Sequence, residues 1–214
     1  MKEIIQIIQA LMRRYAAKGM VDFGNPEDTL IATLLSARTR DEQVLKVYPG
    51  LRKTFPTLKH LARANVKDIA EKISSIGLYR NKAKAIKSLA SRIISVYGGK
   101  VPSTMDDLLT LPGVGRKTAS CVLWYGFGKP AMAVDTHVFR IAHRLGWAKG
   151  KTPEKVEQEL IDLVPKKLWG ELNRTFVQFG RDVCRPGTPQ CWRCPVAKWC
   201  AFEPKTKNIK TLKQ

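Results

Sequence analysis

The chain has 214 residues, enough for one large domain or two small ones, and 44% of them are hydrophobic, which excludes a disordered chain or a mini-protein. No apolar run approaches the roughly 20 residues that span a bilayer, so we expect no membrane-spanning segment. Lys and Arg number 38 against 18 acidic residues, giving a net charge of +20. Because the basic residues are scattered along the chain, we expect a basic folded surface and a polyanionic partner such as nucleic acid, although charge alone also fits a merely alkaline or ribosome-like protein.

The N-terminal segment, residues 1–19, predicts an amphipathic helix. Its apolar residues Ile4, Ile8, Leu11 and Tyr15 fall on one face at helical spacing. Acidic and amide side chains interrupt the apolar stretch and no small-residue cleavage site follows, which disfavours a targeting segment. We therefore expect an intracellular protein.

Helical patterns continue along the chain. The segment at 25–37 begins with a capping Asn25 followed by Pro26, and the segment at 41–55 begins with Asp41 and should stop near Pro49. Further helices are expected at 65–77 and 81–99, each ending on glycine, at 133–146, and at 152–164 behind a Thr152 cap. Nothing alternates like a strand, so the predicted fold class is all-α.

The segment MDDLLTLPGVGRKTASCVLW, residues 105–124, reads as a helix, a tight glycine turn and a second helix. It fails as a Walker A loop because the spacing between its glycines and Lys117 is wrong and no buried strand precedes it. The glycines of the turn allow close approach of backbone, and the N–H groups that open the second helix suit a phosphate. We therefore interpret the segment as a hairpin of helices that meets a nucleic-acid backbone.

Four of the five cysteines fall in one short run, with six, two and five residues between successive members: Cys184, Cys191, Cys194 and Cys200. Disulfides are disfavoured in a reducing compartment, and four close thiolates repel one another unless a cation draws them together, which indicates a metal centre. The spacing does not choose the metal: zinc remains possible, although only one Cys-x₂-Cys pair is present, and the ferredoxin spacing does not match. The fifth, Cys121, lies in an apolar stretch and is interpreted as a core thiol.

The motifs LPGVGRKTA and AVDTHVFR, together with the cysteine run, closely resemble the endonuclease III family of the helix-hairpin-helix DNA glycosylase superfamily. The resemblance extends upstream to LIATLLSARTRDEQV and ISSIGLYRNKAKAI and covers almost the whole chain. It implies a six-helix domain at 21–132 with the helix-hairpin-helix at about 106–125, and a second domain formed by 1–20 and 133–214. The second domain would carry a [4Fe-4S] cluster on the four cysteines, and DNA would bind in a cleft between the domains.

The resemblance assigns Lys117 as the nucleophile and Asp135 as the catalytic carboxylate. A free lysine is neutral in only about one molecule in 2,500 at pH 7, so attack on a sugar carbon requires an environment that favours the neutral amine. The start of a helix and the neighbouring Arg116 both disfavour a further positive charge there. Taken singly, Lys117 also fits a solvated phosphate contact, and Asp135 fits the N-cap of the helix that follows it.

The resemblance also implies DNA contacts. Leu78 matches a residue that wedges into the base stack when the damaged nucleotide turns out, and Arg38 stands where the family commonly has glutamine, which leaves lesion preference open. His137 matches the family motif and is expected to line the cleft, whereas His143 is expected to be structural. The full set of expected DNA contacts is Arg38, Leu78, Leu111, Gly113, Val114, Gly115, Arg116, His137, Arg193 and Lys198.

The implied activity is that of a bifunctional DNA glycosylase and AP lyase of base excision repair, acting on oxidised or ring-saturated pyrimidines or abasic sites in double-stranded DNA. A monomer in the prokaryotic cytoplasm or nucleoid is expected. One alternative is a monofunctional adenine or mismatch thymine glycosylase, although such relatives typically lack the lysine. The other is a non-catalytic helix-hairpin-helix DNA-binding or redox-sensing protein, which gives Lys117 and Asp135 no role.

Overall fold

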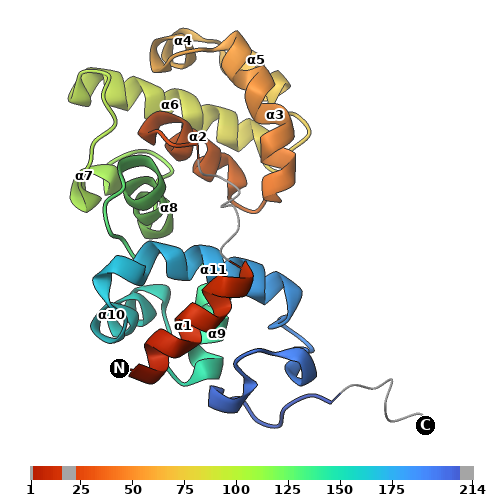
Figure 1. Cartoon of the computed structure of the whole chain (residues 1–214). Helices are drawn as coiled ribbons and strands as arrows, with labels where there is room; N and C mark the ends of the chain where they lie inside the picture. The colour runs from red at the N-terminus through yellow and green to blue at the C-terminus, as the bar shows by residue number, and fades with distance from the viewer. Residues whose placement is uncertain (1, 16–22, 208–214) are drawn as a thin grey trace. The chain divides into compact units, whose positions relative to one another are not determined.

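The structure is a computed structural model that describes residues 2–15 and 23–207. Within these residues every regular element is helical and no strand occurs (Figure 1), which confirms the predicted all-α class. None of the described helices is long and apolar enough to cross a membrane. The chain divides into two compact units, described separately: the hairpin unit, Gly19–Lys129, and the cysteine unit, formed by Met1–Lys18 and Pro130–Gln214.

The hairpin unit is arranged around α2 (Pro26–Ser36), whose residues 29–35 are all buried. Asn25 caps this helix as predicted, its side chain accepting a hydrogen bond from the backbone N–H of Asp28 at 2.8 Å. The other elements are α3 (Asp41–Thr54), α4 (Leu58–Arg63), α5 (Val66–Lys72), α6 (Tyr79–Tyr97), α7 (Met105–Leu109), α8 (Arg116–Cys121) and the π-helical η1 (Val122–Gly126). Helices α4 and α5 pack on α6, while α8 and η1 pack on α2.

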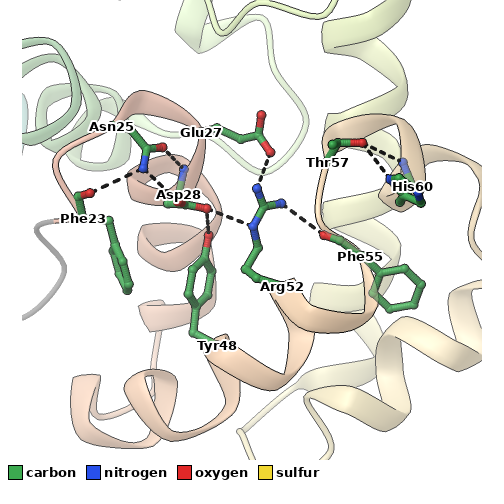
Figure 2. A network of polar contacts seen from close by, with 9 residues as sticks. All are labelled: Phe23, Asn25, Glu27, Asp28, Tyr48, Arg52, Phe55, Thr57 and His60. Atoms are coloured by element: carbon green, nitrogen blue, oxygen red, sulfur yellow. Dashed lines mark hydrogen bonds and ion pairs between the residues drawn. The ribbon is translucent and has the colours of Figure 1, made fainter.

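Helix α3 does not stop near Pro49, as the sequence predicted, but continues through it to Thr54. The turn after the proline is held by a polar network with the start of α2 (Figure 2). Arg52 donates to Glu27 at 2.7 Å and to Asp28 at 2.9 Å, and the Tyr48 hydroxyl donates to Asp28 at 2.6 Å. These contacts join residues twenty or more positions apart, and they offset the backbone hydrogen bond that a proline cannot donate.

The prediction that two helices end on glycine is confirmed for α6 and wrong for α5. Gly98 ends α6 in the left-handed conformation, with φ 61°. The predicted helix at 65–77 ends already at Lys72, and Gly77 is not left-handed; Leu78 takes that conformation instead, with φ 59°. A left-handed leucine is sterically unfavourable, so the backbone of this loop is held by its surroundings.

The cysteine unit contains α1 (Lys2–Tyr15), α9 (Thr136–Leu145), α10 (Pro153–Leu163), η2 (Lys166–Leu168), α11 (Trp169–Asp182), η3 (Cys191–Arg193) and η4 (Ala197–Trp199). Helices α1 and α9 both pack on α11 (Figure 1), an element that the sequence analysis did not predict. Of the expected apolar face of α1, Ile8, Leu11 and Tyr15 are buried and Ile4 is only partly buried. Residues 16–19 of that predicted helix lie outside the described residues. The centre of the core is formed by Ile7, Ile8, Leu11, Val138, Ile141, Leu160, Leu172, Phe176 and Phe179.

Candidate active site

The predicted hairpin is formed by α7 and α8, with the glycine turn between them. Leu111 and Val114 are buried, so the backbone and not the side chain of these two residues is what a ligand could reach. Gly113 and Gly115 are exposed. Glycine is favoured at position 113 because its φ is 78°, in the left-handed region. The turn therefore presents backbone to solvent while its apolar side chains anchor it.

Lys117 is the second residue of α8, as predicted, and its side chain is half-buried beside the exposed Arg116. The second half of the helix is anchored in the core, where Ala119, Ser120 and Cys121 are all buried. The burial of Cys121, at 4% exposure, confirms it as a core thiol. The amine is thus carried by a short helix that is anchored against α2.

Asp135 is the N-cap of α9. Its Oδ1 accepts hydrogen bonds from the backbone N–H groups of His137 at 2.9 Å and Val138 at 2.8 Å. Two backbone donors at the helix start hold the carboxylate in one orientation. Asp135 is therefore an N-cap, as one of the two interpretations of the sequence expected. The capping bonds do not use the second oxygen of this half-buried side chain, Oδ2, which can act as a further acceptor. Asp135 belongs to the cysteine unit and Lys117 to the hairpin unit.

His137 is held on α9 by a close contact with α11. Its Nδ1 lies 3.2 Å from Arg140 Nη2, and Arg140 also donates to the backbone oxygens of Gly180 at 3.3 Å and Cys184 at 2.9 Å. A Cβ at Gly180 would lie 2.5 Å from His137 Nδ1, closer than atoms can approach. The close packing of the two helices therefore depends on glycine at this position. His143, expected to be structural, lies with its two ring nitrogens 2.8 and 3.0 Å from backbone oxygens.

The four clustered cysteines line a single pocket, which we call the cysteine pocket. The pocket is partly open to solvent, and its other lining residues include Arg144, Phe179, Val183, Val196 and Phe202. As their side chains stand, no three Cys, His, Asp or Glu residues in the described chain form a group that could hold a metal ion.

The electrostatics of the cysteine pocket favour neutral thiols when no cation is present. The pKa of Cys194 is raised to about 11, mainly by burial and in smaller part by the charges of the neighbouring cysteines. Arg144 compensates in part by donating to Cys184 Sγ at 3.3 Å. Burial raises the pKa of Cys200 as well. Four thiols that line one pocket are a donor set that a multiply charged metal centre would satisfy, because such a centre favours thiolates.

Two of the expected DNA contacts, Arg193 and Lys198, lie in the loop that carries the clustered cysteines, and their surroundings differ. Arg193 donates to the Asp182 carboxylate at 2.5 Å and to its backbone oxygen at 3.0 Å, so its guanidinium ties the loop to the end of α11. Tyr15 donates to the same carboxylate at 2.8 Å. Lys198 is exposed and stacks over the Trp199 ring at 4.0 Å. Of the two expected DNA contacts, Lys198 is the more available to an external phosphate.

Arg38 and Leu78, the remaining expected contacts, are exposed residues on neighbouring loops of the hairpin unit. Both have left-handed backbones, with φ 54° and 59°. A Cβ at Gly77 would lie 3.6 Å from the Arg38 backbone oxygen, which places the two loops in contact. Sequence reasoning missed Lys82, which lies beneath them and is 6% exposed. The sequence does hold a sign of its burial, because Lys82 lies on the apolar stripe of α6, one turn before Ile86.

Three comparisons with known proteins agree. Residues 31–166 match the family model described as "HhH-GPD superfamily base excision DNA repair protein". The chain is 47% identical to endonuclease III of Thermotoga maritima over 83% of this chain and 84% of the relative, and 41% identical to endonuclease III of Bacillus subtilis over 82% and 81%. A solved structure of a trapped endonuclease III–DNA covalent intermediate superposes with a TM-score of 0.87, 37% identity and coverage of 94% and 95%. The chain is also similar to the solved structure of a thermostable thymine-DNA glycosylase, with a TM-score of 0.83, 26% identity and coverage of 94% of this chain and 96% of that one. The chain therefore belongs to the endonuclease III family of the HhH-GPD superfamily of base excision DNA repair proteins.

Proposed function

We propose that this protein is a bifunctional DNA glycosylase and AP lyase that removes oxidised or ring-saturated pyrimidines from duplex DNA and cleaves the strand at the resulting site. One observation carries the proposal: Lys117 follows the glycine turn in a chain that is 37% identical to an endonuclease III trapped as a covalent DNA intermediate. A covalent intermediate requires a nucleophile, and a lysine amine can form one with a sugar carbon.

In this proposal the neutral amine of Lys117 attacks C1′ of the damaged nucleotide. The C–N bond forms as the glycosidic bond breaks, and the base leaves with the electron pair and takes up a proton. Loss of a proton from the amine and opening of the sugar give a Schiff base. Removal of a C2′ proton then expels the 3′ phosphate by β-elimination, and hydrolysis of the imine releases the lysine.

Asp135 would stabilise the positive charge that develops at C1′ as the base leaves. A carboxylate that accepts two backbone N–H groups is held in a fixed orientation, which suits electrostatic stabilisation without reorganisation. Its uncapped oxygen would face the sugar and accept protons during the later steps.

The four cysteines would hold a [4Fe-4S] cluster, which when bound supplies a cross-link between the end of α11 and the loop that follows it. The donor set fits such a group, because all four thiols line one pocket and thiolates are the ligands that iron–sulfur clusters take. Broad visible absorption that dithionite bleaches, with iron and sulfide in equal amounts, is the expected result. Colourless protein with one equivalent of zinc would contradict the cluster.

The expected partner is double-stranded DNA, bound by a monomer at the bacterial nucleoid. The hairpin backbone at Gly113 and Gly115 would meet a phosphate, and the exposed Arg116 and Lys198 would add charge. Because the net charge is +20, affinity for undamaged duplex should fall steeply with salt.

Borohydride trapping tests the proposal. The protein is incubated with a duplex containing thymine glycol or an abasic site, with borohydride present, and the covalent adduct is resolved on a denaturing gel. Lys117→Gln should abolish the adduct. The matched control is Lys100→Gln, which removes the same charge from an exposed position in the same unit and should leave the adduct unchanged.

The alternatives give different outcomes in the same experiment. Base release without a trapped adduct would support a monofunctional glycosylase, a reading favoured only by the structural similarity to a thymine-DNA glycosylase. Binding to the duplex with neither base release nor adduct would support a non-catalytic DNA-binding protein.

A further inference from the structure

A buried lysine on α6 has no role in the chemistry described above. Lys82 is 6% exposed, and its Nζ donates to the backbone oxygen of Leu35 at 2.7 Å and to Thr39 Oγ1 at 2.6 Å. Neither acceptor is charged. Burying an ammonium against neutral acceptors is costly, and burial lowers the pKa of Lys82 accordingly. An apolar residue at this position of α6 would avoid the cost, so the presence of a lysine there needs a physical reason.

The acceptors of Lys82 belong to the end of α2 and the loop that carries Arg38. Leu35 lies at the C-terminal end of α2, where backbone oxygens favour a cation. Thr39 directly follows Arg38. The side chain of Lys82 therefore fixes this loop from both sides of its exposed arginine.

The backbone of Lys82 holds the second loop. Its N–H donates to the backbone oxygen of Leu78 at 3.0 Å, the first hydrogen bond of α6. Among the described residues, Arg38 and Leu78 are the two non-glycine positions with positive φ, and both are exposed. Left-handed backbone at such residues persists only where surrounding contacts determine it. One residue thus contacts the two strained loops together.

We propose that Lys82 is a positioning residue that fixes the loops of Arg38 and Leu78 relative to each other, so that both side chains enter the duplex together when a base is turned out. The inference rests on the proposed function. Turning a nucleotide out of a duplex requires one side chain to separate the stacked bases and another to fill the space that is left. Two side chains on separate loops can do this together only if the loops keep a fixed spacing.

Single-turnover base release on two substrates tests the proposal. One substrate has thymine glycol in a fully paired duplex, and the other has the same lesion within a run of mismatches, where the base is already unstacked. Lys82→Met, which keeps the length and apolar stem of the side chain, should slow release from the paired duplex by about tenfold relative to wild type. Release from the mismatched duplex should stay at the wild-type rate. Equal losses on both substrates, or no loss on either, would overturn the proposal.

Lys87→Met is the matched control. Lys87 is on the same helix and also donates to a backbone oxygen, that of Ala64 at 2.8 Å, but it contacts neither loop. The Lys87→Met variant loses the same charge and one comparable hydrogen bond. The ratio of its base-release rates on the paired and the mismatched duplex should equal that of wild type. A matching change in Lys87→Met would assign the effect to charge or stability and overturn the proposal.

A pair of variants at Thr39 covers the case in which Lys82→Met does not fold. Thr39→Val removes the acceptor of Lys82 and keeps the shape of the side chain, whereas Thr39→Ser keeps the hydroxyl. Selective slowing on the paired duplex by Thr39→Val, with recovery in Thr39→Ser, is expected. Identical rates for the two variants would contradict the proposal.

Limited trypsin digestion separates a failure of this inference from a failure of the proposed function. Faster cleavage after Arg38 and Arg40 is expected in Lys82→Met and not in Lys87→Met, because both arginines are exposed in the loop that the lysine holds. This readout requires no enzyme activity. Absence of base release by wild-type protein would contradict the proposed function, while unchanged trypsin cleavage would contradict the role of Lys82.

Discussion

Replacing Asp135 separates its two candidate roles, because asparagine can cap a helix but cannot carry a negative charge. The carboxylate accepts from two backbone N–H groups, at 2.9 and 2.8 Å. Asparagine is about as good an N-cap as aspartate, whereas alanine at a capping position costs about 1 kcal/mol. A change of that size shifts the melting temperature of a chain of this length by about 2–4 °C.

We therefore expect Asp135→Asn to melt at the wild-type temperature and Asp135→Ala to melt about 2–4 °C lower. Base release from a thymine glycol duplex should fall in both variants by about 100-fold or more, the usual effect of removing a group that stabilises a transition-state charge. Melting is followed by circular dichroism, and base release under single-turnover conditions.

Thr152→Ala is the control for the loss of a cap. Thr152 caps α10 in the same unit, its hydroxyl accepting from the Lys155 N–H at 3.4 Å. This variant should lose stability like Asp135→Ala but release base at the wild-type rate. Wild-type activity in Asp135→Asn would refute the reasoning, because it would show that the residue acts only as a cap.

Two further predictions concern the cysteine unit. Gly180→Ala should lower base release and melting temperature together, because the new Cβ would stand 2.5 Å from His137 Nδ1 and must displace it; unchanged values in both measurements would show that α11 moves aside without consequence. Asp182→Asn removes the carboxylate that Arg193 binds, and the pKa of Asp182 is lowered by its hydrogen bonds from Arg193 and Tyr15. The ionised carboxylate therefore contributes stability above its ordinary pKa, and this contribution is lost as pH falls through its pKa in the folded protein. Melting curves should separate wild type from Asp182→Asn at pH 6 and converge on acidification, and a constant difference would contradict this linkage.

The helix boundaries that local chemistry specifies could be predicted from sequence. The caps at Asn25 and Thr152 and the stop at Gly98 act within a few residues of the chain, so their signals are visible in a short window. Pro49 misled the prediction because the contacts that sustain α3 beyond it come from the start of α2 (Figure 2). Arg52 and Tyr48 contact carboxylates twenty or more residues away, and a local sequence pattern does not reveal such contacts.

The candidate site, like the helix boundaries, could be predicted where residues close in sequence define it, but not where distant residues meet. The cysteine spacing identified four residues that line one pocket, yet it gave no sign that Arg193 is occupied by Asp182. The motif around Asp135 left capping and catalysis as alternatives. The structure shows that Asp135 caps α9, and the two roles are compatible, because both capping hydrogen bonds go to Oδ1 and do not use Oδ2.

The left-handed residues show where local rules and function diverge. Glycine would relieve the backbone strain at Arg38 and Leu78, and neither side chain is buried, so packing gives no reason for a larger residue at either position. At position 113, where φ is also positive at 78°, the chain does use glycine. A strained backbone that carries an exposed arginine and an exposed leucine is therefore best explained by what these side chains contact outside the protein. The buried ammonium of Lys82 follows the same logic, because its cost is offset only if the two loops must keep one conformation.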